Sequence, residues 1–178
     1  QSRSSAASDV YKRQSLNDIS MEEEDKLLTH MSELDRVVGG GIVPGQLTLV
    51  GGDPGIGKST ILLLMCQNLA ADGRKILYLS GEESLKQIKI RAMRIGEFTD
   101  QLKLLRETDL DTVEAVIKQE KPDIVVIDSI QTMYAERVTS APGSVSQVRE
   151  ATAVFLRLAK SMPLATFIVG HVTKEGTV

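Results

Sequence analysis

The chain has 178 residues, of which 42% are hydrophobic and 25% charged, values that suit one domain with a substantial core and exclude a compositionally disordered chain. The formal net charge is −3 and aromatic residues make up 3%, which argues against nucleic-acid binding through a general positive field or through aromatic stacking. The single cysteine, Cys66, excludes an internal disulfide and a cysteine-based zinc site, and it suits a cytoplasmic location. No apolar run reaches the roughly 20 residues of a membrane helix, so no membrane partner is expected.

Residues 1–15 are polar, rich in Ser and Ala, and without hydrophobic periodicity. We expect them to be a disordered leader or a remnant of cloning or sequence assembly, with one domain over residues 16–178. The acidic run at 22–25 is interpreted as a solvated surface segment.

From residue 47 onward, short apolar runs alternate with segments of helical periodicity. The predicted strands are 47–50, 76–79, the weaker 102–105, 124–127 and 165–169. The predicted helices are 59–71, 83–95, 108–119 and 144–160, with Thr108 and Asp111 spaced like a capping pair at the start of the third. Nearly continuous apolar strands joined by helices indicate an α/β fold, a mainly parallel twisted sheet with helices on both faces.

The first predicted strand runs into a segment that fits the phosphate-loop pattern G-x-x-x-x-G-K-[ST], Gly52-Asp53-Pro54-Gly55-Ile56-Gly57-Lys58-Ser59. Glycines let the backbone curl around an anion, and the amides at the start of the next helix point their positive ends at a phosphate. We expect Lys58 to contact the β- and γ-phosphates of ATP, Ser59 to ligate Mg²⁺, and Thr60 to close the α-phosphate side. The alternative, a chance glycine-rich turn, conflicts with the flanking strand and helix.

The apolar strand at 124–127 ends in Asp128, which is the pattern of a Walker B motif. We expect this strand to lie beside the phosphate-loop strand, so that Asp128 supports Mg²⁺ through a water molecule. An aspartate at a strand end can also cap a turn, so the metal assignment depends on the phosphate loop.

Two adjacent carboxylates, Glu82 and Glu83, follow the strand at 76–79. Because ligands bind at the carboxyl ends of parallel strands, one of them could orient the water that attacks the γ-phosphate. We choose Glu82 as the catalytic residue and expect Glu83 to begin the next helix, where the macrodipole favours negative charge. The alternative is that both are helix-start acids.

His171 follows the apolar core of the last predicted strand. A polar group here could contact the γ-phosphate and report its loss to the segment that follows. The alternative is a structural histidine.

The segment 131–143 is long for a connection in a compact domain and has no clear periodicity. It leaves the sheet on the nucleotide side, where Arg137 and Arg149 could contact a nucleic-acid strand. The alternative is a plain surface connection.

Several motifs together carry a resemblance to a known family. They are Leu34 to Gly45 ahead of the phosphate loop, Tyr78 to Ser84, Ile127 to Thr132, Ser140 to Glu150, and Gly170 to Gly176. Over residues 16–178 the chain resembles the ATPase core of the bacterial RadA (Sms) family of DNA-repair proteins, relatives of RecA and of replicative ring helicases.

The resemblance implies a RecA-like P-loop NTPase fold and DNA-stimulated hydrolysis of ATP with Mg²⁺. It also implies a homo-oligomeric ring that moves on single-stranded or branched DNA, processes recombination intermediates and serves a recombinase partner. By the same resemblance, Glu82 is the catalytic glutamate, His171 senses the γ-phosphate, and residues 132–143 form the first DNA-binding loop.

The family also has a four-cysteine zinc module before this core, and a Lys-Asn-Arg-Phe-Gly motif and a Lon-like domain after it, none of which occurs in this sequence. We therefore expect a fragment that binds nucleotide but lacks the complete DNA-dependent motor. The alternative function is a nucleotide switch of the KaiC type, which controls assembly or partner binding without work on DNA.

Overall fold

The computed structural model describes residues 13–18, 26–52 and 57–171, and it contains a five-stranded sheet in which every pairing is parallel. The strand order is β1-β5-β4-β2-β3. The strands are β1 (Leu47–Gly52), β2 (Ile76–Ser80), β3 (Leu102–Arg106), β4 (Ile124–Asp128) and β5 (Ala165–His171). All five predicted strands are therefore present, each extended by one or two residues at its carboxyl end.

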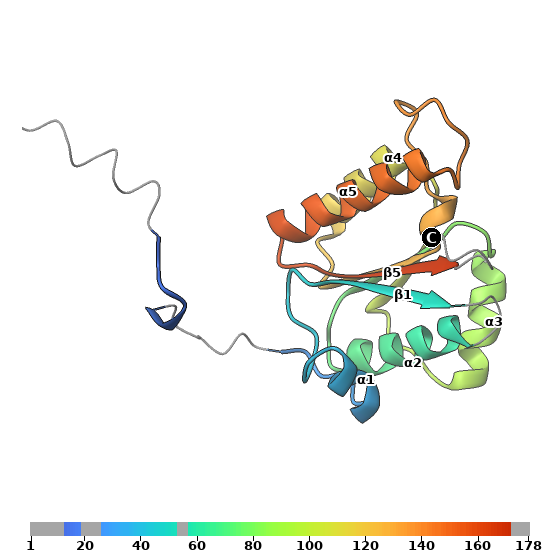
Figure 1. Ribbon diagram of the computed structural model, residues 1–178. Helices are drawn as coiled ribbons and strands as arrows, with labels where there is room; N and C mark the ends of the chain where they lie inside the picture. Colours follow the sequence, from blue (N-terminus) through green and yellow to red (C-terminus); the bar gives the residue numbers. More distant parts are fainter. Residues whose placement is uncertain (1–12, 19–25, 53–56, 172–178) are drawn as a thin grey trace, which may run out of the picture.

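Helices cover both faces of the sheet, as Figure 1 shows. The helices are α1 (Ser32–Val37), α2 (Lys58–Ala71), α3 (Leu85–Ile95), α4 (Leu110–Glu120) and α5 (Val145–Ser161), with short 3-10 turns η1 (Leu16–Asp18) and η2 (Ile130–Thr132). In Figure 1, α1 and α2 lie below the sheet, and α4 and α5 lie above it. The predicted α/β architecture is confirmed.

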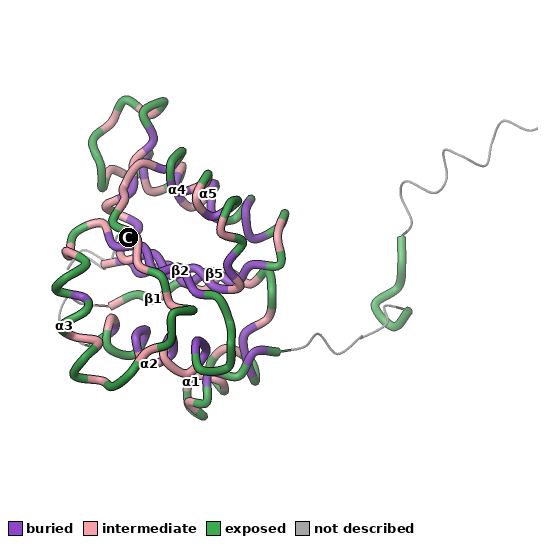
Figure 2. Tube along the Cα trace, turned by 180° about the vertical axis from the view of Figure 1, so that it is seen from behind, coloured by how far each residue is buried: buried purple, intermediate pink, exposed green. Residues whose placement is uncertain are grey.

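Each face of the sheet has its own apolar core, because successive strand residues point to opposite faces. Val126 of β4 packs with Met65 of α2 and Phe167 of β5 in the first core. Its neighbours Val125 and Ile127 pack with residues of α4 and α5 in the second core. Figure 2 shows the buried positions along the sheet and on the helix sides that face it. Burial on both faces explains why the strands are nearly continuous runs of apolar residues.

The predicted position of the Walker B strand is wrong. We expected β4 beside the phosphate-loop strand β1, whereas β5 lies between them and pairs with both. The reason is burial: Ala165–Gly170 of β5 is buried throughout, as a central strand requires, whereas β1 is an edge strand on which Leu49 stays 56% exposed. Asp128 therefore approaches the phosphate loop across one intervening strand.

Two helices also begin at residues other than those predicted. Asp109, not Thr108, caps α4, because its Oδ2 accepts from the backbone N–H of Thr112 at 3.1 Å. The carbonyl of Thr108 instead accepts from the N–H of Tyr134, which holds Thr108 outside the helix. Helix α3 begins after Ser84, whose side chain accepts from the N–H of Gln87.

The expected leader falls mostly outside the described residues, and so does the acidic run at 22–25. Residues 13–15 are exposed and precede η1, and the domain boundary at residue 16 stays a prediction.

Candidate active site

Four of the predicted site residues meet at the carboxyl end of the sheet. Ser59, Glu82, Asp128 and His171 line one hollow of about 170 Å³, together with Ser80 and Glu83. These side chains come from α2, from the ends of β2, β4 and β5, and from the segment after β2. This is the edge of a parallel sheet at which ligands bind, because the connections there leave room for them.

The phosphate loop begins and ends in glycine conformations that other residues rarely adopt. Gly57 has a φ of 83° and occupies the N-cap of α2, so the chain enters the helix through a left-handed residue. Gly52 closes β1 with a φ of 152°. The predicted phosphate-binding residues 53–56 lie outside the described residues. Thr60 occupies the first turn of α2 and is exposed.

Lys58 opens α2 and is only 9% exposed. Its Nζ donates to the carbonyl oxygen of Gly52 and, at 3.5 Å, to that of Gly170 at the end of β5. Both partners are neutral, and among the described residues no carboxylate pairs with this ammonium group. A buried cation balanced only by carbonyl dipoles is suited to an incoming anion.

The Asp128 carboxylate receives two hydrogen bonds on the same oxygen. Ser59 Oγ donates to Oδ2 at 3.4 Å, and Tyr78 OH donates to Oδ2 at 3.0 Å. Burial and the neighbouring Asp128 charge raise the pKa of Tyr78, so its hydroxyl stays protonated and acts as the donor. A serine hydroxyl beside a carboxylate supplies the hard oxygen ligands that Mg²⁺ prefers, so the residues present fit this ion.

The two adjacent glutamates have different surroundings. Arg91 Nη2 of α3 donates to Glu83 Oε1, and Ser80 Oγ donates to the backbone carbonyl of Glu83 at 2.7 Å. Glu83 precedes the cap of α3, so its expected role as the first residue of that helix is wrong; its charge is balanced by Arg91 instead. Glu82 is exposed to the hollow and has no ion-pair partner among the described residues.

His171 is held through its backbone by a residue that the sequence did not indicate. Gln131 Nε2 donates to the carbonyl of His171 at 3.1 Å, and the His171 N–H donates back to Gln131 Oε1 at 3.4 Å. The Nδ1 atom of His171 is buried and has no hydrogen-bond partner within the described part of the chain. His171 lines the hollow, and its ring thus contains a buried polar atom that no described group satisfies.

The segment after η2 is anchored to α5 by one buried side chain. Gln147 accepts from the N–H of Ala135 at 2.9 Å and donates to the carbonyls of Ala135, Val138 and Ser140. Arg137 donates to Glu150 and to Asp111, and these carboxylates raise the pKa of Arg137. The two arginines predicted to contact DNA therefore differ in their pairing, since Arg137 already has two carboxylate partners.

Arg149 lies exposed in the first half of α5, outside every ion pair recorded for the described residues. Of the two arginines predicted to contact DNA, Arg149 is the one without an ion-pair partner among the described residues, and its role stays a prediction.

Sequence reasoning missed Tyr78, Gln131 and Gln147. One signal pointed to Tyr78: a tyrosine inside an aliphatic strand must find a partner for its hydroxyl when buried. Nothing local indicated the two glutamines, because their partners are backbone groups supplied by distant segments.

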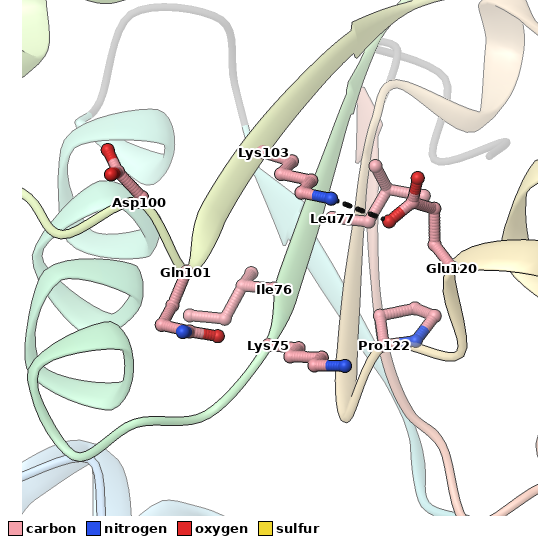
Figure 3. Close-up of a pocket in the computed structure, with 8 residues that line it drawn as sticks. All are labelled: Lys75, Ile76, Leu77, Asp100, Gln101, Lys103, Glu120 and Pro122. Atoms are coloured by element: carbon pink, nitrogen blue, oxygen red, sulfur yellow. Dashed lines mark hydrogen bonds and ion pairs between the residues drawn. The ribbon is translucent and has the colours of Figure 1, made fainter.

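A second hollow, of about 200 Å³, lies at the opposite end of β2 and β3. Figure 3 shows Lys103 and Glu120 pointing toward each other there, with Lys103 Nζ donating to Glu120 Oε2 at 2.8 Å. None of the predicted site residues lines it. The described residues contain no group of three or more His, Cys, Asp or Glu that could hold a metal ion by itself.

A family model described as AAA domain matches residues 12–177. The chain belongs to the AAA-domain family. This match supports an ATPase and the nucleotide-binding phosphate loop predicted from the sequence.

Curated relatives named DNA repair protein RadA are similar to the chain, which confirms the resemblance predicted from the motifs. Those of Halalkalibacterium halodurans, Listeria monocytogenes and Bacillus subtilis are 54%, 56% and 50% identical, over 95%, 92% and 95% of this chain. The alignments cover 37%, 36% and 37% of these relatives, so the chain spans little more than a third of their length.

Among solved structures, the ATPase domain of G40P matches with a TM-score of 0.69 at 15% identity, covering 84% of this chain and 64% of that one. At this identity the likeness shows the fold alone, and it agrees with the predicted RecA-like P-loop architecture. In the part of the chain that the structure describes, no helix has the length and apolar character needed to span a membrane.

Proposed function

We propose that the chain is the ATP-hydrolysing core of a DNA-repair motor. The observation that carries this proposal is the convergence of Ser59, Glu82, Asp128 and His171 on one hollow, next to the buried ammonium group of Lys58. Such a set combines a phosphate-binding cation, oxygen ligands for Mg²⁺ and a free carboxylate, which are the parts that phosphoryl transfer requires.

Lys58 and the amino end of α2 bind the β- and γ-phosphates, and Lys58 exchanges its long contact to Gly170 for phosphate oxygens. Ser59 and Asp128 would hold Mg²⁺, which neutralises charge on the phosphates when bound. His171 offers its buried Nδ1 to the γ-phosphate. Positioning and charge neutralisation provide most of the rate increase.

Glu82 orients and deprotonates the attacking water. The water oxygen forms the new bond to the γ-phosphorus, its proton passes to Glu82, and the bond to the β–γ bridging oxygen breaks, so ADP keeps that oxygen. Glu82 suits this role better than Glu83, because Arg91 already neutralises the Glu83 carboxylate. A base needs a carboxylate that is free to accept a proton near the reacting atoms.

The relatives are named as DNA-repair proteins, which supports a role on DNA. We propose that DNA stimulates hydrolysis, that branched recombination intermediates are processed, and that the protein works in the cytoplasm as a ring with a recombinase as partner. Arg149 and the segment 132–143 on the nucleotide side form the candidate contact surface. Arg149 is its better-placed cation, since Arg137 is paired with Glu150 and Asp111.

The alternative, a nucleotide switch without work on DNA, is favoured by this same pairing of Arg137, which reduces the free positive charge on the loop. Phosphate release from Mg²⁺ and ATP, measured with and without single-stranded DNA, separates the two functions. We expect DNA to raise the rate and Arg149→Ala to reduce this increase. Arg157→Ala is the matched control, because it removes an arginine further along the same helix. Turnover that is indifferent to DNA supports the switch, and failure to bind nucleotide overturns both.

A further inference from the structure

Tyr78 is a polar side chain in the middle of an apolar strand. It belongs to β2, whose five residues are all buried, and it has no exposed surface itself. Its ring packs in the core under α2, with Met65 and Phe167 among the members of that core. A phenylalanine would fill the same space, so the hydroxyl calls for a separate explanation.

The hydroxyl reaches the predicted Walker B carboxylate. Tyr78 pairs with Val126 in the register of β2 and β4, so Asp128 lies two residues further along the adjacent strand, on the same face of the sheet. Tyr78 OH donates to Asp128 Oδ2 at 3.0 Å. This bond is shorter than the 3.4 Å bond that Ser59 Oγ makes to the same oxygen. Tyr78 is therefore the closer of the two donors that hold this carboxylate.

We propose that Tyr78 is a positioning residue for the metal of the nucleotide: its hydroxyl holds the Asp128 carboxylate in the orientation in which it supports Mg²⁺. This inference rests on the proposed function, because it assumes that Ser59 and Asp128 are the residues that hold the ion. A carboxylate that is already fixed loses little rotational freedom when the ion binds. Groups that orient metal-binding carboxylates in this way commonly change metal affinity when they are removed.

A purely structural hydroxyl would have a different signature. Its loss would lower the melting temperature and leave the Mg²⁺ requirement of nucleotide binding unchanged. A positioning hydroxyl changes the Mg²⁺ requirement and leaves nucleotide affinity without metal unchanged, because Tyr78 has no contact with Lys58 or with the phosphate loop among the bonds described.

The test compares Tyr78→Phe with the parent chain and with the matched control Tyr134→Phe. Binding of a fluorescent, non-hydrolysable ATP analogue is titrated against Mg²⁺ and repeated in excess chelator. For Tyr78→Phe we expect the Mg²⁺ concentration at half-saturation to rise about tenfold, with equal affinity in chelator and no change in the control. An unchanged Mg²⁺ midpoint in a folded Tyr78→Phe protein overturns the inference. Absence of analogue binding by the parent chain overturns the proposed function instead.

If Tyr78→Phe does not fold, fluorine NMR of the parent chain tests the role of Tyr78 instead. The chain has three tyrosines, so fluorotyrosine labelling gives three fluorine NMR signals, and Tyr11→Phe and Tyr134→Phe assign that of Tyr78 by elimination. Adding Mg²⁺ to the analogue complex should shift the Tyr78 signal. A signal that responds to the analogue alone and not to Mg²⁺ contradicts the inference.

Discussion

The two ends of the sheet use their charged side chains differently. At the amino end of β2 and β3, Lys103 and Glu120 are paired with each other across a small hollow. At the carboxyl end, Lys58 has only carbonyl partners and Glu82 has no ion-pair partner among the described residues. Both ends have a hollow and unpaired charges, since Lys75 and Asp100 at the amino end also have no ion-pair partner among the described residues, but these two are exposed to solvent whereas Lys58 is buried. A buried charge without a countercharge, rather than the presence of a cavity, therefore identifies the candidate site.

The largest difference between the two ends is expected when one lysine is removed from each, Lys58 at the carboxyl end and Lys103 at the amino end. Lys58→Ala should weaken binding of an ATP analogue by about 100-fold, because hydrogen bonds between charged groups contribute roughly 1.5–3 kcal/mol each. Calorimetric titration with Mg²⁺ present measures this affinity, and circular dichroism checks that the fold is retained.

Lys103→Ala is the matched control at the amino end, where the ion pair is largely exposed. It should leave analogue affinity unchanged and alter the free energy of unfolding by less than about 1 kcal/mol. Equal loss of binding in the two variants would contradict the assignment of the site.

At the carboxyl end, the adjacent glutamates also differ in pairing: Glu83 is ion-paired with Arg91, and Glu82 has no ion-pair partner among the described residues. Glu82→Gln should retain ATP binding and lower turnover by about 100-fold or more, which is the usual contribution of a positioned base. Glu83→Gln removes the partner of Arg91, so its main expected effect is lower stability. Steady-state phosphate release and thermal melting separate the two effects, and loss of turnover from Glu83→Gln alone would reverse the assignment.

The smallest effect is expected from the Asp109 carboxylate, which caps a helix and lies outside the candidate site. Asp109→Ala removes the cap of α4 and should reduce the free energy of unfolding by about 1 kcal/mol. The melting temperature should then fall by about 2–4 °C in a chain of this size. Thr108→Ala is the control that should change it less; the opposite order would restore the capping pair expected from the sequence.

Local patterns predicted most of the fold and the core of the site. The strands, the phosphate loop and Asp128 depend on neighbours in the sequence, on apolar continuity and on glycine spacing, so they are visible in one stretch of chain. The position of β5 between β1 and β4 depends on which strands need burial on both faces, a property of the assembled sheet.

The partners of side chains were the least predictable part. Gln131 and His171 are 40 residues apart in sequence, and Tyr78 and Asp128 are separated by 50. No periodicity connects such positions. The pairing of Glu83 with Arg91, which distinguishes Glu82 from its neighbour, likewise became apparent only once α3 was in place.

The attachment of the 132–143 segment by Gln147 has a mechanical consequence. A connection tied only at its two ends bends on its own, whereas this one is pinned near its middle to the first turn of α5. Helix α5 and this segment should therefore move as one unit. We expect a tilt of α5 to displace residues 135–140 with it, because Gln147 is bonded to Ala135, Val138 and Ser140.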